Sequence, residues 1–178
     1  MNLTLANAGI PMLMVYGPLM LAALLPVVLV EAGIVKALTG GSYGQWSLRV
    51  GLANAASTVV GVPLTWIALV VIQLSIGGGS AHGLETFWQR VYAATVQAPW
   101  LIPYEDDLGW MIGGAGLTLS LPFFLVSMLI EYWVLSRLTR RNVPEERIGF
   151  AAVLICNGVT YGFIAAFWAL MLGLGLMS

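Results

Sequence analysis

The sequence predicts an all-α integral membrane protein with four transmembrane helices, arranged as two parallel-repeat helical hairpins with a short interfacial helix in the central loop. Of its 178 residues, 60% are apolar and only 8% are charged, whereas a soluble domain carries about 25% charged residues. The charged residues cluster between four long stretches that contain none. A hydrocarbon core about 30 Å thick requires roughly 20 apolar helical residues, and each stretch is long enough. We expect residues 1–178 to form a single membrane domain.

The four predicted spans cover residues of about 11–38, 48–76, 108–138 and 148–176. Prolines inside three of them predict local kinks, which neighbouring helices in a membrane tolerate; these are Pro18, Pro26, Pro63 and Pro122. The first residues, 1–5, lack the basic region and cleavage site of a signal peptide, so we expect them to be retained.

The basic residues predict the orientation of the chain in the membrane. They flank or fill the two short connections, and they are Lys36, Arg49, Arg137, Arg140, Arg141 and Arg147. The long central connection contains Arg90 alone among four acidic residues. The positive-inside rule therefore places the two short basic loops in the cytoplasm, with both termini and the central loop outside. The same six residues could bind anionic lipid headgroups, although their role as topology determinants explains them as well.

The central connection contains a predicted interfacial segment at about residues 83–97. Leu84, Phe87, Trp88 and Val91 recur there at helical spacing, a pattern typical of a short helix at the outer surface of the membrane. Aromatic side chains in and around this segment predict an interfacial belt: Phe87, Trp88, Tyr92, Trp100, Tyr104 and Trp110. The segment serves either as an interfacial anchor or as a docking surface or lid.

A polar pattern occurs once in each half of the chain. A glutamate near the cytoplasmic end of one span is followed, after a basic turn, by Asn-x-x-Ser/Thr in the next span. The residues are Glu31, Asn54 and Ser57 in the first half and Glu131, Asn157 and Thr160 in the second, with 22 and 25 residues between glutamate and asparagine. Because each half crosses inward and then outward, the pattern predicts a parallel repeat whose pseudo-twofold axis follows the membrane normal.

The depth of these residues predicts contacts within each hairpin. Glu31 precedes Lys36 by five residues and Asn54 follows Arg49 by five, so both lie roughly 7 Å inside the cytoplasmic rim. A carboxyl group can then meet a carboxamide on the next helix. One interpretation is structural, with Asn and Ser/Thr holding the hairpin together through hydrogen bonds. The other is ion handling, in which an intramembrane carboxyl binds and releases a proton or cation.

Small residues recur every four positions in three spans, which predicts close helix packing. They are Ala53, Ser57 and Gly61 in the second span, Gly109 and Gly113 in the third, and Gly158 and Gly162 in the fourth. If the packing of a four-helix bundle leaves one of these stripes unused, that stripe would suit oligomerisation. The expected partner is the lipid bilayer, and a homo-oligomer or a larger membrane complex stays open.

Several chemistries find little support in the sequence. The single cysteine, Cys156, allows no disulfide pair, and the single histidine, His82, stands outside the spans, so we expect no cofactor. The net charge of −1 predicts no nucleic-acid partner. A run at the outer start of the third span could hold a divalent cation but also suits a helix cap, so we expect no metal; it is Glu105, Asp106 and Asp107.

Function remains open between two hypotheses. No set of nucleophile, base and oxyanion donors converges in the sequence, so we expect no catalytic residues, although a lipid enzyme that uses only carboxylates stays open. The first hypothesis is an accessory, assembly or scaffold subunit of a membrane complex. The alternative is a small transporter or channel-like protein for protons, cations or a small solute, with Glu31 and Glu131 as the intramembrane ion-handling groups.

Overall fold

The computed structural model describes residues 10–77, 84–98, 100–101, 108–139 and 148–175. Several residues singled out from the sequence lie outside these ranges: His82, Tyr104, Glu105, Asp106, Asp107, Arg140, Arg141 and Arg147. The backbone of Trp100 is described, but its side chain is not.

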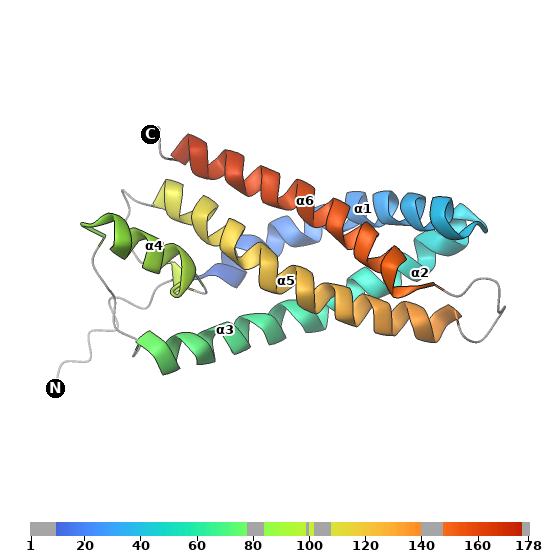
Figure 1. Ribbon diagram of the computed structural model, residues 1–178, viewed down its shortest axis with the longest axis horizontal. Helices are drawn as coiled ribbons and strands as arrows, with labels where there is room; N and C mark the ends of the chain where they lie inside the picture. Colours follow the sequence, from blue (N-terminus) through green and yellow to red (C-terminus); the bar gives the residue numbers. More distant parts are fainter. Residues whose placement is uncertain (1–9, 78–83, 99, 102–107, 140–147, 176–178) are drawn as a thin grey trace. The chain divides into compact units, whose positions relative to one another are not determined.

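The described chain is almost entirely helical (Figure 1). The long elements are α1 (Met12–Thr39), α2 (Tyr43–Ala56), α3 (Val62–Gly77), α5 (Leu108–Thr139) and α6 (Phe150–Gly175). A short helix, α4 (Phe87–Thr95), lies in the central connection. Two-residue strands, β1 (Ile10–Pro11) and β2 (Trp100–Leu101), pair antiparallel.

Four helices are long and apolar enough to cross a membrane: Gly17–Thr39, Tyr43–Ile76, Gly109–Thr139 and Phe150–Gly175. The chain is therefore a multi-pass helical membrane protein, as the composition predicts. Compared with the full helices α1, α2–α3, α5 and α6, the ends of the predicted spans agree within a few residues except at the start of the second, where the helix begins at Tyr43 and not near residue 48. It extends into the turn because Gly40 and Gly41, both with positive φ, end α1 and reverse the chain within three residues.

The second span is not a regular α-helix. Between α2 and α3 it widens into one turn of π-helix, η2 (Ser57–Gly61), in which the Val62 N–H donates to the Ser57 carbonyl. Pro63 follows directly, and its ring both lacks an N–H and crowds the carbonyl four residues earlier. The kink predicted at Pro63 thus takes the form of a π-turn, a recognised way to bend a helix.

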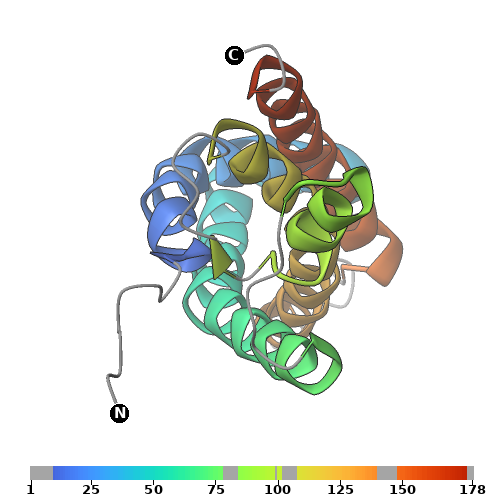
Figure 2. The same ribbon diagram turned by 90° about the vertical axis from the view of Figure 1, so that its left-hand side faces the viewer.

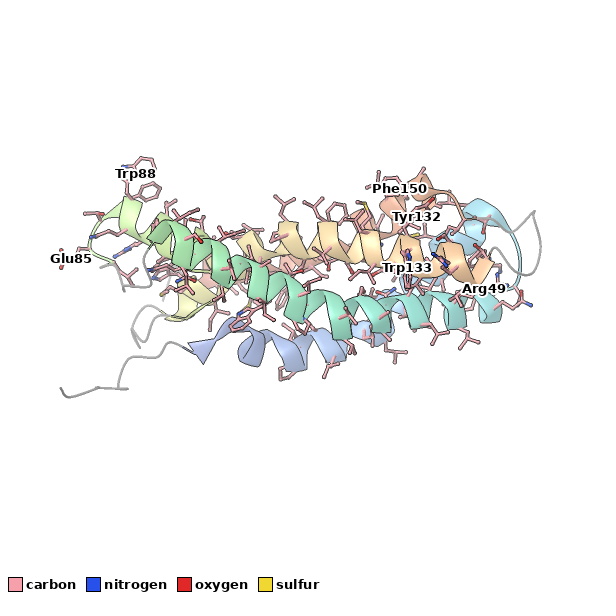
Figure 3. All side chains as sticks on the ribbon, turned by 90° about the horizontal axis from the view of Figure 1, so that it is seen from below. Arg49, Glu85, Trp88, Tyr132, Trp133 and Phe150 are labelled. Carbon is pink, nitrogen blue, oxygen red and sulfur yellow. The ribbon has the colours of Figure 1, made fainter. Side chains whose placement is uncertain are left out.

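The helices divide into two compact units, which we name by their most distinctive residues. The carboxyl unit comprises residues 18–65 and 122–163, and the glycine unit comprises residues 1–17, 66–121 and 164–178. The apolar core of the carboxyl unit consists of buried side chains from α1, α2, α5 and α6 and from Ile148 just before α6: Ala32, Val35, Trp46, Val50, Ala53, Met128, Leu135, Ile148, Val153 and Cys156. At one end of this unit Tyr132 packs edge-on against Phe150, with ring centroids 5.3 Å apart (Figure 3).

In the glycine unit, α5 and the last turns of α6 approach so closely that glycine is required. A Cβ built on Gly113 would lie 2.5 Å from the backbone nitrogen of Leu172, and one on Gly175 would lie 2.5 Å from the carbonyl carbon of Gly109. Figure 2 shows the start of α5 directly beside the red end of α6. The predicted stripe Gly109 and Gly113 therefore serves packing between helices of the same chain.

Candidate functional site: a buried carboxyl–amide network

The carboxyl group of Glu31 on α1 is held by the neighbouring helix α2. The Asn54 Nδ2 donates to Glu31 Oε2 at 2.7 Å, and the same nitrogen donates to the Val50 carbonyl one turn earlier at 3.1 Å. Both acceptors lack a proton to give, so they fix the orientation of the Asn54 amide with its NH₂ group toward the carboxyl. This is the contact between consecutive helices that the spacing predicts.

The second glutamate is held in the same way by α6. The Asn157 Nδ2 donates to Glu131 Oε2 at 2.8 Å and to the Val153 carbonyl at 3.2 Å. The amide orientation is again fixed by two acceptors. The two asparagines therefore occupy equivalent positions, each one helical turn after a valine carbonyl and opposite a glutamate of the preceding span.

The hydroxyl groups of the motif cross to the other glutamate. Ser57 Oγ donates to Glu131 Oε1 at 2.9 Å, and Thr160 Oγ1 donates to Glu31 Oε1 at 2.8 Å. The expectation that Ser and Thr hold their own helix pair together is thus wrong. A residue three positions after an asparagine lies on the same helix face one turn further along, and at that depth each hydroxyl meets the glutamate of the other pair.

The four helices are therefore joined in a closed ring of side chains. Each glutamate binds the asparagine of its own helix pair and the hydroxyl of the other pair, and Cys156 adds a longer contact from Sγ to the Glu31 carbonyl at 3.8 Å. All six motif residues are buried, and the two glutamates are each only 1% exposed. Residues that are up to 129 positions apart in the sequence converge on one polar centre.

Glu131 has a further donor that the sequence reading missed. Ser127, one turn earlier on α5, donates from Oγ to Glu131 Oε1 at 2.8 Å. Spacing of four on a helix was a sufficient signal, since such pairs face each other. The equivalent position before Glu31 is Val27, which has no hydrogen-bonding side chain. Glu131 thus accepts three hydrogen bonds and Glu31 accepts two.

No basic group is among the hydrogen-bond partners of either carboxyl in the part of the chain that the structure describes. The basic side chains near the ends of the spans contact tryptophan rings instead: Arg49 lies 5.1 Å from the Trp46 ring and Arg137 lies 5.5 Å from the Trp133 ring. Such cation–π contacts keep a guanidinium at the membrane surface. Lys36 is exposed. The carboxyls consequently repel each other without a compensating cation from these residues.

The hydroxyls in the ring have a second choice of acceptor. Ser57 Oγ lies 3.0 Å from the Asn54 carbonyl, and Thr160 Oγ1 lies 3.2 Å from the Cys156 and Asn157 carbonyls. A hydroxyl has one proton and two lone pairs. When it donates to the backbone, it can accept a proton from a neutral carboxyl, and when it donates to the carboxyl, it stabilises the charge. The centre is compatible with both states without movement of heavy atoms.

The aromatic residues of the central connection have two different surroundings in the glycine unit. Phe87 and Trp88 on α4 are 70% and 75% exposed, and Trp88 points away from the helices (Figure 3). Trp110 is buried, with Arg90 5.9 Å from its ring, and Tyr92 is half-buried. The start of α4 is fixed by a capping box between Thr86 and Gln89, a signal visible in the sequence.

No match to this chain is found among models of protein families, among curated proteins or among solved structures. Among the described residues, no three His, Cys, Asp or Glu side chains come together in a way that could hold a metal ion. Function is therefore inferred from the carboxyl centre itself.

Proposed function

We propose that the protein is a small transporter or channel-like protein that moves protons or small cations, with Glu31 and Glu131 as the groups that bind the ion. One observation carries the proposal: two buried carboxyls from two different membrane spans share one hydrogen-bonded centre, and no positive side chain is among their described partners. Ionisable groups at such positions are expensive and are functional candidates by default.

Electrostatics supports this role over a purely structural one. Two buried like charges cost several kcal/mol unless something neutralises them. The partners that the structure describes are neutral amides and hydroxyls, which soften a negative charge but do not cancel it. Because no described side chain supplies the neutralising charge, we propose that an exchangeable ligand does, and exchange of that ligand is the elementary step of ion transport.

The proposed arrangement in the membrane follows from the repeated motif and the basic residues. The pairs α1–α2 and α5–α6 act as two hairpins related by a pseudo-twofold axis along the membrane normal. The helix ends that carry Lys36, Arg49 and Arg137 face the cytoplasm, where these side chains meet anionic headgroups. α4 lies in the outer interface with Phe87 and Trp88 in the lipid, an orientation that their exposure favours.

Flux through the reconstituted chain tests the proposal. The protein is incorporated into liposomes with a proton-sensitive or cation-sensitive dye, and a gradient is imposed. Glu31→Gln and Glu131→Gln keep shape and one hydrogen-bonding oxygen but remove the charge, so each variant should fold and lose at least tenfold in flux. Glu85→Gln, an exposed glutamate on the approach to α4, is the matched control and should leave flux unchanged. Flux that survives in the double variant would sink the proposal.

The second candidate is the accessory, assembly or scaffold subunit, and one observation favours it. Gly158 and Gly162 on α6 are exposed, and a Cβ built on either would meet nothing within 4 Å. Unlike Gly113, they serve no packing within the described chain, so a stripe for close helix approach is left for a second copy or another subunit. Mild-detergent purification from native membranes with mass spectrometry tests this: a partner at fixed ratio that is lost with Gly158→Leu supports it.

A further inference from the structure

The chemical nature of the ligand can be inferred from the atoms that surround the two carboxyls. We infer that the centre binds a proton, shared between Glu31 and Glu131, and not a metal cation. The inference rests on the proposed function in taking this centre as the ion-handling site, and it goes further by naming the ion and the groups that accommodate it.

Metal cations require oxygen atoms directed at one point, and the two Oε2 atoms of this centre face hydrogen atoms instead. Both Oε2 atoms face an amide NH₂, at 2.7 Å from Asn54 and 2.8 Å from Asn157. Each NH₂ also donates to a backbone carbonyl, which prevents the amide from turning its oxygen toward the carboxyl. Na⁺, K⁺ or Mg²⁺ would meet the positive ends of these N–H dipoles where it needs lone pairs.

A proton suits the same atoms. The amides bind Oε2 in either protonation state of the carboxyl, while the proton resides on Oε1. There the Ser57 and Thr160 hydroxyls turn from donating toward the carboxyl to donating toward backbone carbonyls at 3.0 and 3.2 Å. Because the two carboxylates repel each other, a proton on either one relieves the repulsion between them.

An independent observation indicates that a donor binds here. The Oδ1 atom of Asn157 is buried and has no hydrogen-bond partner among the described residues, although Asn157 is 1% exposed. Buried carbonyl oxygens in proteins almost always have a donor. This oxygen belongs to the amide that binds Glu131, so a water molecule carrying a proton to Glu131 would donate to it. This donor would lie on the side of the second glutamate.

Among the described residues, few titratable groups face the two carboxyls. They are the carboxyls themselves and, from α6, Cys156 and Tyr161. From α2 and η2 the facing groups are Asn54 and Ser57, which do not titrate. Tyr161 lies beside Ser127, the third donor to Glu131. The Tyr161→Phe variant is therefore measured in the experiment below as well. A proton signal that remains in this variant belongs to the glutamates and not to the tyrosine.

Infrared spectroscopy of the full chain in lipid nanodiscs tests the inference, because a protonated carboxyl has a C=O stretching band that a carboxylate lacks. We expect a band at neutral pH that disappears as the pH is raised, that persists when Na⁺ or K⁺ replaces choline, and that is absent from the Glu31→Gln/Glu131→Gln variant. Absence of the band throughout the pH range in which the chain stays folded would overturn the inference. So would its loss on adding Na⁺, K⁺ or Mg²⁺ at constant pH.

Matched variants test the role of the Ser57 and Thr160 hydroxyls, which change their acceptor when the carboxyls gain a proton. Thr160→Val and Ser57→Ala should move the midpoint of the titration upward by roughly one pH unit, because a charge-assisted hydrogen bond to the carboxylate is lost. Thr139→Val and Ser120→Ala remove buried hydroxyls that donate only to their own helix in the described structure and should leave the midpoint unchanged. Equal shifts in both sets would contradict the assignment of Ser57 and Thr160.

The infrared and flux experiments can fail separately. A proton band without flux leaves the proton site standing and removes the proposed transport. Cation flux with a band displaced by that cation keeps the transport and removes the proton assignment.

Discussion

The two glutamates of the carboxyl centre have similar surroundings, and their differences show how a repeated motif becomes asymmetric. Each carboxyl accepts from an asparagine of its own helix pair and from a hydroxyl of the other pair. Glu131 accepts a third bond from Ser127, where the first half has Val27. The hydroxyl on the first side begins a π-turn, whereas Thr160 stands in regular α-helix. The motif thus sets the contacts, and its flanking residues set their strength.

Removal of either carboxyl should have the largest effect on stability and should show the difference between the two glutamates most clearly. Glu131→Ala removes an acceptor from three donors and should lower the free energy of unfolding by roughly 2–3 kcal/mol, whereas Glu31→Ala removes one from two donors and should cost roughly 1–2 kcal/mol. Unfolding in mixed micelles measures both. Glu85→Ala serves as the exposed control, and equal losses for the two buried glutamates would show that the third donor contributes nothing.

The asparagines should differ in the same direction. Asn54→Leu removes a bond to a carboxyl and should cost roughly 1–2 kcal/mol. Asn157→Leu removes the equivalent bond and also the buried Oδ1, which we infer accepts from a bound donor, so its cost should be larger. The same unfolding measurement compares the pair. A smaller loss for Asn157→Leu would mean that no donor binds Oδ1 in the membrane.

Removing the Ser127 hydroxyl from the second half, or adding a hydroxyl at position 27 in the first, should test whether the third donor accounts for the difference between the two glutamates. Ser127→Ala should destabilise the protein by about 0.6 kcal/mol, the average for a hydrogen bond within a membrane protein. Val27→Ser places a hydroxyl one turn before Glu31 and should stabilise the charged form of that carboxyl. The infrared titration reports both changes. If Val27→Ser alters neither the stability nor the titration, the serine does not reach Glu31.

The smallest expected effect concerns the π-turn. Pro63→Ala restores an N–H and lets the helix return to α-helical spacing, which would rotate Ser57 away from Glu131. Stability should change by less than about 0.6 kcal/mol, but the coupling between Ser57→Ala and Glu131→Gln in a double-mutant cycle should fall toward zero. Coupling that persists would show that Ser57 is placed by packing and not by the proline.

The extent to which the sequence predicts this structure follows from how local each contact is. The spans are predictable because the length of an apolar run determines whether it crosses a bilayer. The Glu31–Asn54 contact is predictable because a three-residue turn places both residues at similar depth on consecutive helices. The crossing of Ser57 to Glu131 is not, because it depends on which helix pair faces the other, and apolar surfaces in lipid encode that choice weakly.

Other parts of the site and fold needed more than periodicity. Ser127 stood four residues from Glu131, so its contact was accessible to the i, i+4 rule. The π-turn was not, because a proline predicts a bend without specifying its form. The close approach of Gly113 to Leu172 required the partner helix to be known. Small-residue stripes alone did not distinguish this internal contact from the exposed glycines of α6.

The crossed hydroxyl bonds also bear on how such a chain can arise. The α1–α2 pair by itself offers a glutamate that lacks a hydroxyl donor and a hydroxyl that lacks a carboxyl acceptor. Two identical copies related by a twofold axis would satisfy both at once, since an isologous interface repeats every contact in reciprocal form. Fusion of such copies into one chain would free the second copy to diverge. Val27 and Ser127, which stand four residues before Glu31 and Glu131, are the kind of difference that a covalent link permits.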